Sequence, residues 1–268
     1  LMKRKGKFDS IVVETTGLAD PGPVAQTFFA DADVRAKTKL DAIVTVVDAK
    51  HAAQQLASQE EAVEQVAFAD VILLNKTDLV SKDELAALER QLRAINATAR
   101  VHRMTRGDVG LDNILNLGAF DLDRVTEIDP HFLPDHDCDD GCVHHDHDHD
   151  HDHDHDHGHH HHHHDDHVAA AGIASISMSS DKPMNPEKLL PWLNEITQTQ
   201  GPDILRLKGI IAFPDEPKRF VLQGVHMILE GDTQRAWRDD EKRVSRLVFI
   251  GKNLDRAALE RAFAACVA

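Results

Sequence analysis

Four apolar residues, 71–74, lead directly into the polar tetrad Asn75-Lys76-Thr77-Asp78. A short apolar run of this kind is typical of a strand that is buried on both faces of a parallel sheet. In open α/β sheets, ligands bind outside the carboxyl ends of the strands, and the tetrad occupies that position. The feature therefore predicts an α/β fold in which these polar side chains face a ligand. The plainer alternative is a strand followed by an ordinary turn and helix.

Asp78 has the chemistry expected of a guanine-binding residue. A carboxylate can accept two parallel hydrogen bonds from N1 and N2 of guanine, which adenine cannot donate, and charge-assisted bidentate pairs are strong and selective. We therefore expect Asp78 to select GTP or GDP over adenine nucleotides. Asn75 would brace the loop or the base edge, and the stem of Lys76 would lie along the ring face.

A second apolar run, residues 8–13, is expected to form another strand, and it is followed by Glu14-Thr15-Thr16-Gly17. The Glu14 carboxylate can hold Mg²⁺ through water or position an attacking water, while Gly17 lets a backbone N–H approach the γ-phosphate. The Glu-x-x-Gly pattern alone is weak evidence. Combined with the tetrad in one α/β pattern, it predicts a nucleotide switch.

The rest of the first half alternates helix and strand signals, as βαβ units do. We expect strands at 40–47 and 100–104 and helices at 24–29 and 49–69. Another helix should follow the capping box Ser81-Lys82-Asp83-Glu84, with a buried face formed by Leu85, Leu88, Leu92 and Ile95. Met104 and Thr105 are candidates for a further base or ribose contact, with an ordinary strand-to-helix turn as the alternative.

Residues 168–268 show a different pattern. It predicts a strand at 172–178, a helix starting at Pro186, strands at 204–213, 219–229 and 244–250, and a last helix capped by Asp255. Such a sequence favours a small antiparallel α+β domain.

Histidine and aspartate are concentrated between residues 135 and 167, which hold 16 of the 20 His and no Lys or Arg. Imidazole and thiolate bind Zn²⁺ and related transition metals, so the segment predicts metal binding. It has almost no residues that could form a core, and we expect it to be disordered without metal. An inert polar linker or a purification tag are the alternatives. The candidate ligands are Cys138, Cys142, His144, His145, His147, His149, His151, His153, His155 and His157.

Charge and cysteine content narrow the function classes. Most of the net charge of −16 falls in the His/Asp-rich segment, so the remaining chain offers no electrostatic case for binding nucleic acid or a membrane. The sequence has no run of 18 apolar residues. Three Cys do not make a disulfide framework, and we expect a reducing, cytoplasmic location.

These motifs together resemble the CobW-like metallochaperone GTPases, part of the larger group that contains the hydrogenase and urease nickel-insertion GTPases. Residues 14–21 look like the acidic switch motif of that family, and Asn75–Asp78 match its guanine motif. The His-rich insert lies where many members carry one. Stretches between 209 and 251 look like the C-terminal domain of the family.

The resemblance implies an α/β fold, with an incomplete P-loop GTPase-type parallel sheet with flanking helices, followed by a smaller α+β C-terminal domain. The expected units are a GTPase domain at 1–130, a disordered metal-binding linker at 131–167 and the C-terminal domain at 168–268. The chain contains neither a G-x-x-x-x-G-K-[ST] phosphate loop nor the C-x-C-C metal motif of the family. Both would precede Leu1, so we expect the complete protein to be a GTPase and this chain alone to bind GTP weakly.

For function, the resemblance implies a GTP-hydrolysing metallochaperone that uses GTP/GDP and Mg²⁺, binds Zn²⁺ and delivers it to a client metalloprotein. Ni²⁺, Co²⁺ and Cu²⁺ stay open as the metal, and a homo-oligomer stays open as the assembly. Glu14 and Gly17 would couple hydrolysis to the metal site. The alternatives are a metal buffer with vestigial nucleotide binding, or cobalt handling in cobalamin biosynthesis.

Overall fold

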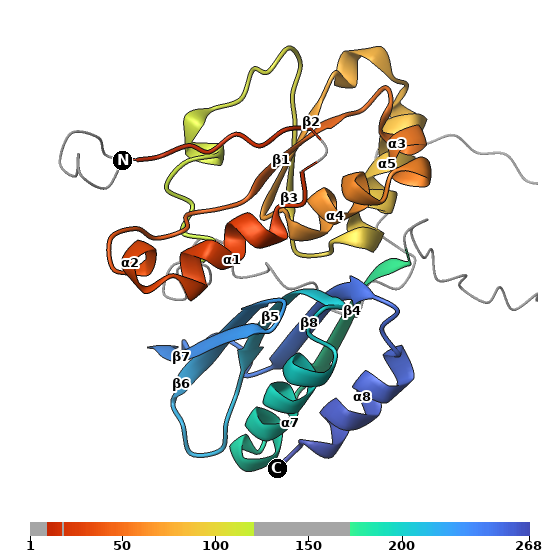
Figure 1. The fold of residues 1–268 in the computed structure, drawn as a ribbon. Coiled ribbons are helices and arrows are strands. Elements are labelled where there is room, and N and C mark those ends of the chain that lie inside the picture. Colours follow the sequence, from red (N-terminus) through yellow and green to blue (C-terminus); the bar gives the residue numbers. More distant parts are fainter. Residues whose placement is uncertain (1–9, 18, 121–171) are drawn as a thin grey trace, which may run out of the picture.

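The computed structural model describes residues 10–17, 19–120 and 172–268, which carry two sheets (Figure 1). The first sheet is parallel, with the order β1-β2-β3. Its strands are β1 at Val44–Asp48, β2 at Val71–Asn75 and β3 at Arg100–Arg103. In this register Asp48 lies beside Asn75, so the carboxyl ends of β1 and β2 meet at one edge of the sheet.

Helices flank the parallel sheet. They are α1 at Gly22–Ala30, α2 at Ala32–Arg35, α3 at Ala52–Ser58, α4 at Glu60–Phe68 and α5 at Lys82–Ile95, with 3-10 turns η2 at Thr77–Leu79 and η3 at Leu111–Asn113. The predicted capping box of α5 is confirmed, because the backbone N–H and side chain of Ser81 both pair with Glu84. Its predicted apolar face is buried as well.

The single helix expected over residues 49–69 is two helices. Gln59 has an extended backbone, with φ −127° and ψ 113°, and separates α3 from α4. On either side of the break, α3 buries Leu56 and α4 buries Val63, Val66 and Phe68. Gln is a good helix former, so the local sequence carries no signal for this break.

The strand expected at residues 8–13 is not formed in its described part. Residues 10–16 have no strand, and Ile11, Val12 and Val13 are exposed, Val12 by 79%. A strand needs a neighbour that takes its backbone N–H and C=O groups. Among the described residues, the parallel ladders join β1, β2 and β3 alone, so this segment has no such neighbour.

The second sheet is antiparallel, with the order β4-β8-β5-β6-β7. Its strands are β4 at Ile173–Ser180, β5 at Ile204–Ile211, β6 at Lys218–Val225, β7 at Ile228–Ala236 and β8 at Ser245–Lys252. The helices α7 at Pro186–Thr199 and α8 at Arg256–Ala265 lie against one of its faces (Figure 1). The predicted fold class is confirmed. No helix in the described ranges is long and apolar enough to span a membrane.

The run expected as one strand at 219–229 is a hairpin. β6 ends at Val225, and β7 starts again at Ile228 after a tight turn. His226, expected on a strand, lies in that turn with φ 51°. Left-handed backbone is uncommon for a residue other than Gly, and apolar residues flank the turn on both sides, so the sequence gives no turn signal here.

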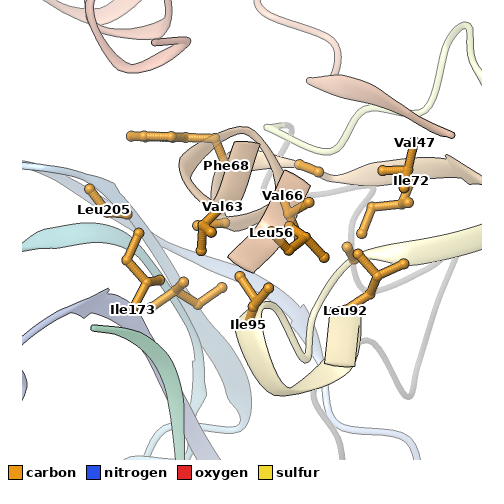
Figure 2. Packing of buried hydrophobic residues seen from close by; sticks show 14 of the residues in the cluster. Val47, Leu56, Val63, Val66, Phe68, Ile72, Leu92, Ile95, Ile173 and Leu205 are labelled. Carbon is orange, nitrogen blue, oxygen red and sulfur yellow. The ribbon is translucent and has the colours of Figure 1, made fainter. Parts of the chain in front are cut away.

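The other face of the antiparallel sheet packs against α4 and α5 of the first part (Figure 2). Val63, Val66 and Ile95 from these helices share one buried cluster with Ile173 and Leu205 of the antiparallel sheet. Separating the two parts would expose this apolar surface to water, at roughly 25 cal/mol per Å². The two sheets therefore share a core, and we expect them to unfold together.

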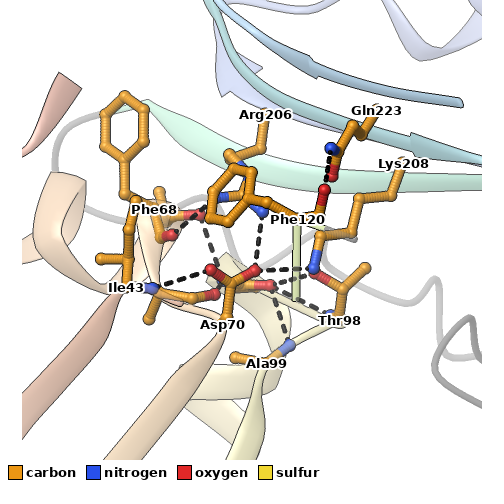
Figure 3. A network of polar contacts seen from close by, with 12 residues as sticks. Ile43, Phe68, Asp70, Thr98, Ala99, Phe120, Arg206, Lys208 and Gln223 are labelled. Carbon is orange, nitrogen blue, oxygen red and sulfur yellow. Dashed lines mark hydrogen bonds and ion pairs between the residues drawn. The ribbon is translucent and has the colours of Figure 1, made fainter. Parts of the chain in front are cut away.

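A buried carboxylate joins the two parts beside this core (Figure 3). Asp70 directly precedes β2, and its Oδ1 accepts hydrogen bonds from Arg206 Nη2 at 2.7 Å and Lys208 Nζ at 2.8 Å. Its Oδ2 accepts the Ile43 N–H at 2.9 Å. Burial acts to raise the pKa of Asp70, but the two cations outweigh it and the pKa is lowered. The start of β2 is thus fixed to β5 of the other sheet.

Candidate functional site

The tetrad begins at the last residue of β2. Asn75 Oδ1 accepts the backbone N–H of Lys76 at 2.9 Å and that of Gly107 at 3.3 Å. Gly107, in the loop after β3, has φ 76°, a conformation that favours glycine. Asn75 therefore connects the loop after β2 to the loop after β3.

The same two loops meet at Thr77. Its hydroxyl donates to the Met104 carbonyl at 3.2 Å and lies 3.5 Å from the Thr105 hydroxyl. Met104 is buried, and Thr105 is half-buried. The structure thus brings the predicted contact residues Met104 and Thr105 together with the tetrad.

Lys76 turns back across the sheet edge toward β1. Its backbone is left-handed, with φ 61°, and its Nζ lies 2.7 Å from Asp48 Oδ2. The same carboxylate oxygen is 3.0 Å from His51 Nδ1, and Oδ1 accepts the Lys50 N–H. Asp48 therefore holds the Lys76 ammonium at the carboxyl end of β1.

Asp48 is a site residue that the sequence reasoning did not assign. Partial burial acts to raise its pKa, but hydrogen bonds from His51, Lys76 and the Lys50 N–H outweigh this and lower the pKa to about 2. The side chain is ionised at neutral pH. The sequence does carry a signal for Asp48, because it is an acidic residue directly after the strand expected at 40–47, just as Glu14 directly follows the run at 8–13.

Asp78 lies within η2 and is exposed, as is the following Leu79. Its carboxylate is open to an incoming donor pair. Guanine N1 and N2 provide such a pair, whereas the corresponding edge of adenine presents an acceptor at N1. An exposed carboxylate at this position thus has the acceptor chemistry that guanine, and not adenine, could use.

Glu14 and Gly17 lie in the exposed segment before α1. Gln65 on α4 donates from Nε2 to the carbonyl of Gly17 at 3.1 Å and to that of Ala19 at 3.0 Å. A Cβ built on Gly17 would meet no atom within 4 Å, so the approach to its backbone is open. In the described parts of the chain, no hydrogen bond or ion pair joins Glu14 to the tetrad.

A cleft of about 560 Å³ lies between α5, β3 and the loop after β3. On its wall, Arg103 pairs with Glu89 through both Nε and Nη2, at 2.6 and 2.7 Å. Burial lowers the pKa of His102, which also lines the cleft. None of the tetrad residues lines it, so the cleft is separate from the edge that carries Asp78.

The predicted metal ligands lie outside the described residues: Cys138, Cys142, His144, His145, His147, His149, His151, His153, His155 and His157. Within the described ranges, no group of three or more His, Cys, Asp or Glu side chains is arranged to hold a metal. Cys266 is buried in the core under α7 and α8, and burial raises the pKa of its thiol. It fills a packing position in this core.

Two family models match the chain in sequence order. Residues 1–103 match the CobW/HypB/UreG nucleotide-binding domain, and residues 173–267 match the cobalamin synthesis protein CobW C-terminal domain. The chain is 33% identical to the zinc chaperone YjiA of Escherichia coli K12, over 96% of this chain and 71% of that protein. It is 30% identical to the zinc-regulated GTPase metalloprotein activator 1 of Schizosaccharomyces pombe, over 96% of this chain and 63% of that protein.

A solved structure supports the same assignment. The crystal structure of the Zn(II)-bound YjiA GTPase from E. coli superposes with a TM-score of 0.74 at 30% identity. The match covers 94% of this chain and 69% of that one. With both domain models matched in sequence order and relatives similar over nearly the whole chain, the chain belongs to the CobW family of GTPases.

Proposed function

We propose that the protein carrying this chain uses GTP turnover to deliver zinc to a client metalloprotein. The observation that carries the proposal is the exposed Asp78 carboxylate on a sheet edge where Asn75 and Thr77 join two loops. The similar proteins include zinc chaperones and a zinc-regulated GTPase metalloprotein activator, which supports zinc as the cargo.

In this proposal Asp78 reads guanine through N1 and N2, and Asn75 keeps the two loops in register. The stem of Lys76 lies along the base while Asp48 holds its ammonium at 2.7 Å. Met104 and Thr105 form the adjoining wall, because both are tied to Thr77. Such pre-organisation lowers the entropic cost of binding the base.

The resemblance also implies Mg²⁺. This ion takes one or two carboxylates and completes its shell with water and phosphate oxygens, so it does not need a cluster of protein ligands. Asp48 is already engaged by Lys76, whereas Glu14 is exposed. Glu14 is therefore the residue that would hold Mg²⁺ or its water, and the Gly17 backbone would contact phosphate. Mg²⁺ would neutralise charge on the phosphates.

A base-competition assay tests the guanine assignment. Asp78→Ala removes both acceptors, and each hydrogen bond to a charged group contributes roughly 1.5–3 kcal/mol. The preference for GTP over ATP should fall more than tenfold, at about 1.4 kcal/mol per factor of ten. Asp83→Ala, an exposed acid in the first turn of α5, is the matched control and should keep the preference. An unchanged preference in Asp78→Ala would favour the metal-buffer alternative.

Deleting residues 143–167 tests whether metal binding and GTP hydrolysis depend on different parts of the protein. Made in the complete protein, the deletion removes most of the His residues, so bound metal per chain should fall while GTP turnover stays unchanged. Metal content is measured by mass spectrometry after dialysis against Zn²⁺, and separately against Co²⁺, Ni²⁺ and Cu²⁺. Loss of turnover in the deletion variant would show that the segment takes part in the nucleotide cycle.

A further inference from the structure

The hairpin turn at His226 reaches the first residue of α1 in the other part of the chain. Gly22 is buried there, and a Cβ built on it would lie 2.7 Å from His226 Nε2 and 3.1 Å from Phe68 Cζ. The rings of His226 and Phe68 are also in contact, with centroids 5.4 Å apart. Any side chain at Gly22 would have to displace these rings, so the imidazole packs directly against the backbone of α1.

His226 is not the residue that its own turn favours. The turn has two central residues between Val225 and Ile228, which are paired, and His226 is the first of them, with φ 51°. Two-residue hairpin turns favour Gly where φ is positive. A strained backbone of this kind persists where the surrounding structure holds it, often at functional sites. Gly at position 226 would relax the turn but would leave Gly22 without the imidazole contact.

The helix α4 connects this contact to the segment that carries Gly17. Phe68 lies on α4 three residues after Gln65, close to one helical turn away. Gln65 Nε2 donates to the carbonyls of Gly17 at 3.1 Å and Ala19 at 3.0 Å. The chain before α1 is therefore held by Gln65 at Gly17 and Ala19, and by the two rings at Gly22.

We propose that His226 is a positioning residue for the nucleotide segment. By fixing Gly22 it would set where Gly17 and Glu14 lie, only a few residues earlier in the chain. The inference rests on the proposed function, in which Gly17 contacts phosphate and Glu14 holds Mg²⁺ or its water. It adds that a residue of the antiparallel domain controls the position of these groups. Misplacement by about 1 Å can lower a rate 10²-fold, so the contact should affect GTP turnover more than guanine recognition.

NMR spectra of this chain test the positioning without any nucleotide. His226→Asn removes the ring but keeps the turn, because Asn tolerates left-handed backbone. We expect the backbone amide signals of Gly17 and Ala19 to shift in this variant. Met227→Ala, at the exposed second position of the same turn, is the matched control and should leave both signals in place. Unchanged Gly17 and Ala19 signals in His226→Asn would refute the proposal.

Kinetics of the complete protein separate positioning from guanine binding. His226→Asn should lower kcat for GTP by about tenfold, while the affinity for GDP stays at the wild-type value because Asp78 is untouched. An unchanged kcat, or equal losses in kcat and GDP affinity, would overturn the inference. If the wild-type protein shows no GTP turnover, the proposed function fails instead, and the amide signals of Gly17 and Ala19 still decide whether His226 positions the segment.

Gly22→Ala provides a second, independent measurement. Its methyl group would collide with the His226 ring, so the Gly17 amide signal should shift and kcat should fall. Combining it with His226→Asn gives the methyl group room, and the double variant should lose less than the two single effects combined. Fully additive losses would count against the proposal. If His226→Asn does not fold, His226→Gly takes its place, because Gly adopts φ 51° without steric cost.

Discussion

Replacing Asp70 by Asn should strongly destabilise the protein. The substitution keeps the shape of the side chain but removes the charge shared by Arg206 and Lys208, which are 2% and 6% exposed. Removing one partner of a buried ion pair typically costs about 3–5 kcal/mol, because it leaves an uncompensated charge in the interior. A domain has roughly 5–15 kcal/mol of stability in total, so the loss is a large share of it and the midpoint of urea unfolding should fall measurably.

Urea unfolding of the whole chain measures this effect, with far-UV circular dichroism and Trp fluorescence as two probes. Because the two sheets share a core, both probes should report one transition. Glu89→Gln, which breaks the exposed pair with Arg103, is the control and should cost less than about 1 kcal/mol. Adding Lys208→Met to Asp70→Asn should recover part of the loss. A cost below about 1 kcal/mol for Asp70→Asn would refute the account of this buried cluster.

The same cluster predicts how stability depends on pH. The pKa of Asp70 is lowered in the folded state, so its contribution is present above the unfolded pKa of about 3.9 and is lost as pH falls through the folded value. Burial lowers the pKa of Lys208 despite Asp70, so the unfolded chain binds more protons near pH 10 and stability should rise there with pH. The gap between wild type and Asp70→Asn should therefore narrow in acid.

Two further perturbations test the first domain. Asn96→Ala should cost about 2–4 kcal/mol in urea unfolding, because the buried amide donates to the carbonyls of Val66, Ala67 and Ala69, whereas the exposed Asn194→Ala should stay within about 0.5 kcal/mol. Asp48 should titrate near its lowered pKa of about 2 by NMR, and Lys76→Met should move this pKa toward about 3.9. Its contribution to stability should be present above about pH 3.9 and be lost as pH falls toward 2, and an unmoved pKa in Lys76→Met would rule out the ion pair.

Elements with strong local signals could be predicted from sequence. The helix α5 has a capping box and an apolar stripe at helical spacing, and both signals agree with its burial in the folded chain. The apolar run at 71–74 and the polar tetrad after it predict where β2 ends, and the strand does end at Asn75. In these cases the local preference and the tertiary environment favour the same structure.

Elements whose state depends on distant partners could not be predicted. Residues 10–13 have strand-like composition, but strand formation needs a paired neighbour. The hairpin turn at His226 carries no Gly, Asn or Pro. Arg206 and Lys208 within an apolar run were an unused signal, because two cations in a buried strand require a counter-charge nearby.

The residues of the candidate site also fall into two groups, those with a local sequence signal and those that depend on distant partners. The tetrad at Asn75–Asp78 could be found because four adjacent residues carry its chemistry. The contact between Asp48 and Lys76 joins residues 28 positions apart, and it depends on the register of β1 beside β2. That register pairs residues about 27 positions apart in sequence, which a single local pattern does not encode.

The central claim is that the edge formed by residues 75–78 and 104–107 binds guanine. NMR titration of the chain with GDP and with ADP at millimolar concentration tests it most directly. The account predicts that GDP shifts the backbone amides of Lys76, Asp78 and Gly107, that ADP does not, and that Asp78→Ala abolishes the response. Equal shifts with GDP and ADP, or GDP shifts confined to other parts of the chain, would contradict it.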